Sequence, residues 1–287
     1  MIDFLLEKMT LRLQTLARQS AALLLYYSRL NNLRQFISNK NYGPKLTILA
    51  YHGVEDYLSN GDIFTISTKQ FEEQMRYLKE NYNVISFLEA IKMKNTLDNS
   101  VDLVIITFDD GYKNNYNNAA PILQKYGLNA CFFLTTDLIT HVPDRLLKTG
   151  SIWKFPGMTQ DEVKALRNGG FEIGAHTCSH PNLLQIPLEI ARNEILWSKN
   201  ELEQVLGETI EYFAYPGGRK QIHYDDSIKA IVAEEFRVCC TTSRGRNNFQ
   251  TIDMLELSRI CVQNWWSLFY FARELEGTFD FIGRFIN

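Results

Sequence analysis

Two adjacent carboxylates, Asp109 and Asp110, directly follow an apolar run that ends at Phe108. The run Leu103–Phe108 is typical of a buried parallel strand. Like charges this close raise the pKa of one carboxyl group, and burial raises it further, so the pair is unfavourable unless something uses it. A bound cation removes the conflict, because one carboxylate then holds the metal while its neighbour accepts a proton. The plain alternative is a polar strand end in which one Asp caps a helix.

Two histidines offer further metal ligands. His176 and His180 follow the strand-like run Phe171–Ala175, and their spacing predicts both imidazoles on one face of a helical turn. Histidines at this spacing are also common on protein surfaces, but this chain has only five His. Two imidazoles and one carboxylate are the protein ligands of an open catalytic zinc site whose fourth position holds water. The four residues therefore predict such a site with a spare carboxylate base.

Two more strand ends carry groups that suit the same chemistry. His52 ends the strand-like run Leu46–Tyr51, and an imidazole at this position can act as a general acid, although a single His after a strand is usually structural. The run Tyr212–Tyr215 ends in Pro-Gly-Gly. Beside a metal, the N–H of Gly217 or Gly218 can stabilise an oxyanion, whereas by itself the motif indicates a plain tight turn.

These groups need a scaffold, and strand-like and helix-like segments alternate about seven times along the chain, which predicts an α/β fold with a parallel sheet. No Gly-x-Gly-x-x-Gly follows the first strand, so a closed or nearly closed barrel is expected, with its chemistry at the carboxyl ends of the strands. The predicted strands are Leu46–Tyr51, Asn83–Ser86, Leu103–Phe108, Ala130–Thr135, Phe171–Ala175, Tyr212–Tyr215, Arg237–Thr241 and Ser258–Val262. The predicted helices are Thr68–Asn81, Asn117–Tyr126, Val163–Asn168, Pro187–Leu206, Asp225–Glu235 and Trp265–Glu276.

The N-terminal part differs from the rest. Residues 1–39 have the pattern of one or two amphipathic helices, which either lie on an anionic membrane surface or pack on the main domain. A polar turn then separates a segment 1–44 from a domain 45–287. The purest apolar stretch, residues 21–27, is far short of the ~20 residues that span a bilayer, and no clear signal peptide is present. The cytoplasm or the inner membrane face is the expected location, with the envelope left open.

Composition narrows the function classes. The chain has 287 residues, a net charge of −3 and a pI near 6.0, which give no reason to expect nucleic acid as a partner. Its five Cys show no Cys-x-x-Cys pairing and no disulfide spacing, and the adjacent Cys239 and Cys240 are expected in the core. Nothing in the composition indicates an oligomeric state.

The order of Thr-Phe-Asp-Asp-Gly, then His-Thr-x-x-His, then a Pro-Gly turn resembles the polysaccharide deacetylases, also called NodB-homology or carbohydrate esterase family 4 enzymes. The resemblance covers roughly three quarters of the chain, from residue 46 to 262. It implies a distorted, TIM-like (β/α)7 barrel and metal-dependent removal of N- or O-acetyl groups from sugars. By position, Asp109 matches the catalytic base, and Asp110, His176 and His180 match the metal ligands. Gly217 matches the residue that supplies the oxyanion N–H.

The chain departs from the family pattern beside the base. Many members have an Arg before the Pro-x-Gly turn, and this Arg tunes the catalytic carboxylate. Here Phe213–Tyr215 occupies that place, so the contact is absent or comes from elsewhere in the chain. Arg219 is one candidate for it.

A second departure concerns the general acid. Many members carry a late Leu-x-His whose His is the acid, but this chain has Arg259 there, and Arg does not release a proton in this pH range. The branch that resembles poly-N-acetylglucosamine deacetylases has a Tyr-His after its first strand instead, and Tyr51-His52 matches it. His52 is therefore expected to be the acid, with His223 and His141 as reserves.

The prediction is a metal-dependent hydrolase that removes N-acetyl or O-acetyl groups from a polysaccharide or glycan precursor. Zn²⁺ is the expected metal for two nitrogens and one oxygen, and Co²⁺, Ni²⁺ or Fe²⁺ also fit such a site. One alternative is a catalytically silent glycan-binding module, since Trp side chains are available to stack on sugars. Another is a deformylase or cyclic amide hydrolase that uses the same site chemistry.

Overall fold

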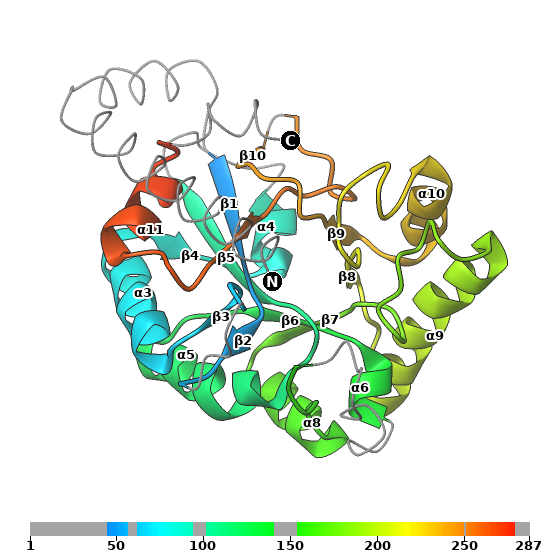
Figure 1. Cartoon of the computed structure of the whole chain (residues 1–287), viewed down its shortest axis with the longest axis horizontal. Helices are drawn as coiled ribbons and strands as arrows, with labels where there is room; N and C mark the ends of the chain where they lie inside the picture. Colours follow the sequence, from blue (N-terminus) through cyan, green and yellow to red (C-terminus); the bar gives the residue numbers. More distant parts are fainter. Residues whose placement is uncertain (1–44, 57–61, 94–101, 141–153, 250, 279–287) are drawn as a thin grey trace, which may run out of the picture. The chain divides into compact units, whose positions relative to one another are not determined.

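The computed structural model describes residues 45–56, 62–93, 102–140, 154–249 and 251–278 (Figure 1). The helices expected in residues 1–44 and the reserve acid His141 lie outside these residues. One compact unit is Pro44–Trp265, and the described part of the other is residues 266–278. None of the helices in the described part of the chain has the length and hydrophobicity that a membrane crossing requires.

Six strands of the larger unit form a curled sheet in which each strand is parallel to the next (Figure 1). In sheet order they are β1 (Lys45–Tyr51), β5 (Leu103–Phe108), β6 (Cys131–Leu134), β7 (Glu172–Ala175), β8 (Tyr212–Ala214) and β9 (Val238–Cys240). Shorter strands add to it: β4 (Asn83–Val84) beside β5, and β10 (Asn247–Asn248) and β11 (Ile260–Cys261) beside β1. A separate pair consists of β2 (Gly53–Val54) and β3 (Thr65–Ile66).

The segment from Leu257 to Cys261 links the two edges of this sheet. Leu257 forms a parallel bridge with Cys240 of β9, and three residues later Ile260 of β11 pairs with Leu49 of β1. The parallel strands therefore curl into a TIM-like, distorted barrel, which confirms the α/β fold predicted from the sequence. The carboxyl ends of its strands meet at one face.

Helices surround the sheet of the larger unit (Figure 1). They are α3 (Thr68–Asn81), α4 (Phe87–Met93), α5 (Ala120–Tyr126), α6 (Thr136–Thr140), α8 (Gln160–Asn168), α9 (Leu188–Leu206) and α10 (Asp226–Glu235), and a π-helical turn, η1 (Asn115–Ala119), precedes α5. The smaller unit contains α11 (Leu268–Leu275). Local sequence signals set the start of α8 and the end of α9. Thr159 forms a capping box with Glu162 at the start of α8, and α9 ends at Gly207, whose φ of +71° suits glycine.

Side-chain packing in the core fixes the positions of the strand ends. All six residues of β5 are buried, as expected for a strand covered on both faces. Phe108 at its end stacks on Phe132 of β6 at 4.8 Å between ring centroids, and Tyr51 stacks on Phe108 from the β1 side. Each such side chain contributes roughly 1.5–3 kcal/mol when fully buried. This packing fixes the positions from which the next residues along each strand emerge. Cys239 and Cys240 are also buried, and all five cysteines are free thiols.

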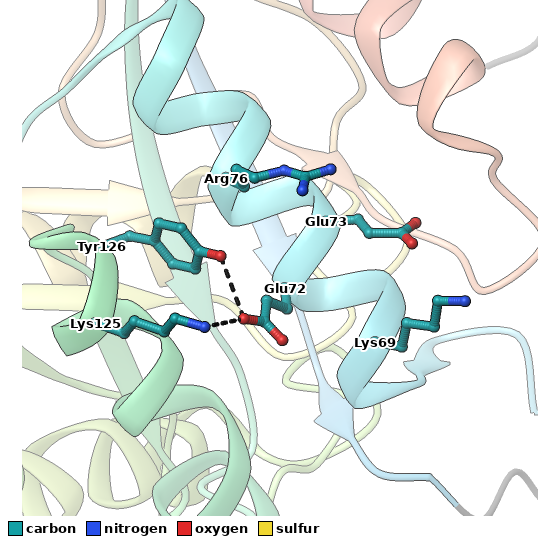
Figure 2. A pocket seen from close by; sticks show the side chains of 6 residues that line it. All are labelled: Lys69, Glu72, Glu73, Arg76, Lys125 and Tyr126. Atoms are coloured by element: carbon teal, nitrogen blue, oxygen red, sulfur yellow. Dashed lines mark hydrogen bonds and ion pairs between the residues drawn. The ribbon is translucent and has the colours of Figure 1, made fainter.

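A groove on the helical layer lies between α3 and α5 (Figure 2). All the residues that line it belong to α3 and α5: Lys69, Glu72, Glu73, Arg76, Lys125 and Tyr126. Glu72 accepts hydrogen bonds from Lys125 at 2.5 Å and from the Tyr126 hydroxyl at 3.2 Å. Exposed ion pairs of this kind are screened by water, and no metal-ligating cluster lies among these side chains.

Candidate metal centre and catalytic site

Strand register brings the expected site residues to one place. Tyr51 pairs with Phe108, so His52 and Asp109 are the next residues on two neighbouring strands, and the N–H of Asp109 donates to the Tyr51 carbonyl at 2.9 Å. On the other side, Leu134 pairs with Ala175, and His176 follows. Because parallel strands end at the same edge, residues more than a hundred positions apart converge on the mouth of the barrel.

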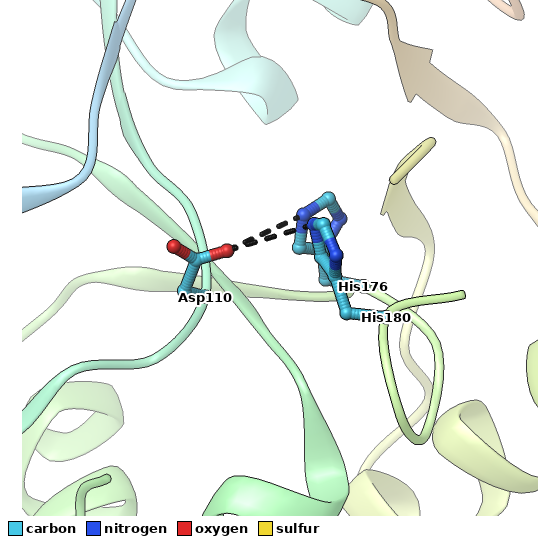
Figure 3. Close-up of side chains that lie close together, drawn as sticks. All are labelled: Asp110, His176 and His180. Carbon is cyan, nitrogen blue, oxygen red and sulfur yellow. Dashed lines mark ion pairs between the residues drawn. The ribbon is translucent and has the colours of Figure 1, made fainter. Parts of the chain in front are cut away.

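Asp110, His176 and His180 form one cluster (Figure 3). The Nε2 atom of each imidazole lies 3.8 Å from Oδ1 of Asp110, and the three ligand atoms lie within 4.8 Å of one another. Atoms that share a tetrahedral zinc at about 2.0–2.2 Å lie about 3.4 Å apart, so only a small inward shift separates this arrangement from a closed metal site. The donor set of two nitrogens and one oxygen fits a divalent cation.

His176 is held in the form that a metal requires. Its Nδ1–H donates to the carbonyl of Ala214 at 2.7 Å, which leaves the Nε2 lone pair toward Asp110. Burial lowers the pKa of His176 to about 4, although the charges of Asp109 and Asp110 oppose that shift. The ring is therefore neutral at physiological pH and able to bind a cation. A backbone carbonyl that orients a ligating imidazole is the usual outer contact of such sites.

The two imidazoles meet for a different reason than the sequence predicts. Residues 176–180 form no helical turn, because Thr177 and His180 both have left-handed backbones, with φ of +64° and +58°. This loop places the rings at 4.8 Å between centroids and 69° between planes. The expectation that His176 and His180 lie together is confirmed, and the helical explanation for it is wrong.

Asp110 occupies a tight turn at the end of β5. Its φ is +74°, and the N–H of Gly111 donates back to the Asp109 carbonyl at 3.0 Å. Asp tolerates this left-handed backbone better than most residues, and Gly111 itself has φ of +90°. The Tyr112 hydroxyl donates to the Asp110 carboxylate, and burial together with that negative charge raises the pKa of Tyr112, so it stays a donor. The turn thus directs two successive carboxylates to different partners.

Asp109 is ion-paired with Arg259. The two guanidinium nitrogens Nη1 and Nη2 each donate to a carboxylate oxygen at 2.7 Å, and both side chains are almost fully buried. Burial opposes ionisation of Asp109, but the charge of Arg259 outweighs it and holds the carboxyl pKa well below its usual value. The rise in pKa expected for one member of the Asp pair is therefore not found at Asp109. Arg259 is itself fixed by hydrogen bonds to the Thr241 carbonyl and the Thr107 hydroxyl.

Arg259 is the residue that the sequence analysis missed, because Arg219 is the candidate expected there for the contact with the base. The Arg259 guanidinium comes from the Leu257–Cys261 segment, on the opposite side of Asp109 from the Pro-Gly turn in sheet order. The available signal is an arginine inside the apolar run Ser258–Val262. A buried arginine is costly without a carboxylate partner, and Asp109 follows β5, the strand on the far side of β1 from this segment.

His52 lies beside Asp109, and its buried Nδ1 forms no hydrogen bond with the described residues. The ring is half-buried against Phe64, at 5.0 Å between ring centroids, and it is near enough to Asp109 to lower the pKa of that carboxyl. The reserve His223 differs, because its Nδ1 accepts the N–H of Arg219 at 3.1 Å and burial lowers its pKa.

The Pro-Gly-Gly turn follows β8. Gly217 has φ of +66°, and a Cβ there would meet the His223 ring at 2.6 Å, so only glycine fits. The Gly217 carbonyl accepts the Thr242 hydroxyl at 2.6 Å. Within the described part of the chain, the Gly217 N–H donates to no other group and remains available.

Comparisons with known proteins agree with this geometry. Residues 96–236 match the family model described as polysaccharide deacetylase. YxkH of Bacillus subtilis, a protein assigned as a polysaccharide deacetylase, is 30% identical over 70% of this chain and 66% of its own length. The poly-β-1,6-N-acetyl-D-glucosamine N-deacetylase of Staphylococcus epidermidis is 27% identical over 58% of each chain. The solved structure of the Streptococcus pyogenes deacetylase PplD, in complex with acetate, superposes with a TM-score of 0.68 at 26% identity, covering 81% of this chain and 99% of that one.

The fold is a TIM-like α/β barrel with a candidate metal cluster at the carboxyl ends of its strands, and the relatives agree with it. The chain belongs to the polysaccharide deacetylase family. It spans about two thirds or less of the length of the two curated relatives named above.

Proposed function

We propose that this protein is a metal-dependent deacetylase that hydrolyses the N-acetyl groups of a glycan. The observation that carries the proposal is the pairing of two carboxylates with different partners at one strand end. Asp110 faces two imidazoles, whereas Asp109 is held ionised by Arg259 beside them. A binding module gains nothing from a buried, ionised carboxylate next to a metal-ligand set. A hydrolase needs that carboxylate as its base.

Asp110, His176 and His180 would hold the metal, with Zn²⁺ as the expected ion and Co²⁺, Ni²⁺ or Fe²⁺ as alternatives. A divalent cation at such a site supplies Lewis acidity toward a carbonyl oxygen and lowers the pKa of water. The protein contributes neutral imidazole at His176 and a carboxylate fixed by the turn at Asp110. A neutral imidazole is the protonation state that metal binding requires of a histidine.

Asp109 is assigned as the general base. Its bidentate contact with Arg259 fixes the carboxylate and keeps it unprotonated, so it is ready to accept a proton from the attacking water. The same contact lowers the basicity of Asp109. The ionised form is therefore fully populated, but it accepts a proton less readily than an ordinary carboxylate. As the proton leaves, the water oxygen adds to the acetyl carbon and the C=O π electrons move to the acetyl oxygen; the C–N bond breaks in the next step, when the amine leaves.

The remaining two roles fall to the neighbouring strand ends. The free N–H of Gly217 is assigned as a donor to the oxyanion that develops on the acetyl oxygen. His52 is assigned as the general acid that protonates the leaving sugar amine as acetate departs. His223 suits this role less, because a neutral ring whose Nδ1 already accepts a backbone N–H has no second proton to give.

The substrate is best tested with a panel of acetylated oligosaccharides. Oligomers of β-1,6-linked N-acetylglucosamine, a chitin oligomer and an O-acetyl ester are incubated with the zinc- or cobalt-loaded protein, and released acetate is measured. We expect acetate from at least one N-acetylated oligomer. Bound metal without acetate from any substrate would favour the glycan-binding module, and formate or a ring-opened product would favour the other amide hydrolases.

The Asp109→Asn variant tests the base. It should keep its metal, because Asp109 is not among the ligands, and it should lose roughly 10²–10⁴-fold in deacetylation rate. Elemental analysis and acetate release are measured on the same sample. A variant with full activity would remove Asp109 from the mechanism.

The acid is tested by comparing two histidines. His52→Ala should abolish deacetylation without changing metal content, whereas His223→Ala should retain most of the activity. The reverse result would transfer the role to His223.

A further inference from the structure

The Glu194 carboxylate, which is not one of the candidate metal ligands, accepts hydrogen bonds from the loop that carries His176 and His180. Oε2 of Glu194, in the second turn of α9, accepts the backbone N–H of Cys178 at 3.0 Å and of Ser179 at 2.8 Å. Its Oε1 accepts the Ser179 hydroxyl at 2.8 Å. Three donors from two consecutive loop residues thus converge on one side chain.

The loop needs these hydrogen bonds because its backbone conformation costs free energy. Thr177 and His180, on either side of the two hydrogen-bonded residues, have left-handed backbones that cost non-glycine residues free energy. The left-handed conformation of His180 directs its imidazole toward Asp110. Strained residues of this kind persist only where surrounding contacts over-determine them.

Other contacts also hold the loop, and the backbone carbonyl of Glu194 itself accepts the Cys178 N–H at 3.2 Å. The carbonyls of Thr177 and Cys178 accept the N–H groups of Thr136 and Asp137, and the His180 N–H donates to the Thr177 hydroxyl at 3.1 Å. Glu194 provides the only side-chain carboxylate that binds the loop N–H groups among the described residues. Its contacts fall directly before His180, the more exposed ligand, whose side chain is 28% exposed.

We propose that Glu194 is a positioning residue for the metal ligand His180. It holds residues 178 and 179 so that the His180 imidazole stays opposite Asp110. The inference rests on the proposed function, since it assigns Glu194 a role in metal binding at the same site. Groups that orient ligands in this way typically change metal affinity by 10–100-fold when they are removed.

The test measures the affinity of the metal-free full-length chain for Zn²⁺ by competition with a chelator dye. Glu194→Ala should raise the dissociation constant about 10–100-fold. Glu194→Gln should restore most of the affinity, because its amide oxygen accepts the same two N–H groups and its NH₂ donates to the Ser179 hydroxyl oxygen. Glu189→Ala is the matched control, since it removes the same charge from an exposed position of the same helix and should leave the constant unchanged.

Two further readouts separate positioning from simple stabilisation. Replacement of Zn²⁺ by Co²⁺ gives a visible spectrum that reports ligand geometry, and this spectrum should change in Glu194→Ala but not in Glu194→Gln. A purely structural residue would lower the melting temperature of the metal-free protein and leave the affinity and the spectrum unaltered. That outcome would overturn the proposal.

If Glu194→Ala does not fold, Ser179→Ala replaces it, with an expected rise in the dissociation constant of up to about 10-fold. An unchanged constant in that variant would likewise overturn the proposal.

Failure of this inference differs from failure of the proposed function. If the wild type binds one zinc ion, His180→Ala weakens that binding, and Glu194→Ala matches the wild type, only the role of Glu194 is wrong. If the wild type binds no zinc at one equivalent, the metal site itself is wrong.

Discussion

The Asp109–Arg259 pair is the residue-scale feature that most distinguishes this site. A buried arginine and a buried carboxylate in bidentate contact cost desolvation energy that their attraction only partly returns, so such a pair is weak evidence for stability. It is stronger evidence for function when one partner must stay ionised. Under the proposed function, the Arg259 guanidinium tunes the base in place of the arginine that the family pattern has elsewhere in the chain.

Arg259→Met tests that role through the pH dependence of kcat/KM. The charge of Arg259 lowers the pKa of Asp109, so its removal should raise that pKa, and a base with a raised pKa is protonated up to a higher pH. The acid limb of the profile should therefore move to higher pH by about 1–3 units.

Arg219→Met is the control for this shift. This substitution removes the same charge as Arg259→Met, but at a residue that does not contact Asp109. Its acid limb should coincide with that of the wild type. An unshifted limb in Arg259→Met would mean that another group keeps Asp109 ionised.

At the scale of elements, apolar runs predicted the sheet well, because burial on both faces leaves a continuous hydrophobic signal. β5 has the bounds expected for it, Leu103–Phe108, and α3 has those expected from its cap, Thr68–Asn81. The family motifs also placed Asp110, His176 and His180 in one cluster. Strand ends were less predictable. β4 stops at Val84 rather than Ser86, since Ser86 turns to cap α4 and bonds the Glu89 carboxylate.

Two features of the site were not predictable from local patterns. The His176–His180 loop depends on left-handed residues and on Glu194, a partner fourteen positions beyond His180 that no spacing rule identifies. Arg259 reaches Asp109 only because the sheet curls and the Leu257–Cys261 segment lies along β1. Both contacts arise from tertiary packing, which a single sequence does not encode in its periodicity.

A prediction at this scale concerns the start of β7. Glu172 accepts the N–H groups of Phe87 and Leu88 at 2.8 and 3.0 Å, and so caps the first turn of α4 from across the fold. Burial raises the pKa of Glu172 despite these bonds. The folded state therefore binds this proton more tightly than the unfolded state, and the contribution of Glu172 to stability falls as the pH rises above its unfolded value.

Glu172→Gln removes this dependence. The stability of the variant relative to the wild type should increase with pH from about 4.5, the ordinary value of a glutamate, toward neutrality. Urea denaturation across that range measures the difference. A difference that stays constant with pH would show that Glu172 does not titrate differently in the folded and unfolded states.

At the scale of the whole molecule, the metal site depends on the closed sheet. Asp110 follows β5 and His176 follows β7, while Arg259 reaches the neighbouring Asp109 from a segment 150 residues away. A ligand that binds this arrangement and not the unfolded chain must stabilise the fold by mass action. Under the proposed function, metal binding is therefore coupled to global stability as well as to activity.

This coupling predicts a metal-dependent melting temperature. Zn²⁺ at one hundred times its dissociation constant should raise the free energy of unfolding by about 2.7 kcal/mol. Asp110→Asn, which weakens one ligand, should show a much smaller rise at the same zinc concentration. Equal rises in both proteins would indicate that zinc binds somewhere else.

The central claim is that one divalent ion, shared by Asp110, His176 and His180, makes this barrel a deacetylase. The most direct measurement titrates the metal-free protein with Zn²⁺ and follows acetate release from an N-acetylglucosamine oligomer. The account predicts activity that rises in proportion to zinc and reaches its plateau at one equivalent, with no such rise in His176→Ala. Full activity without metal, or an identical titration in His176→Ala, would contradict it.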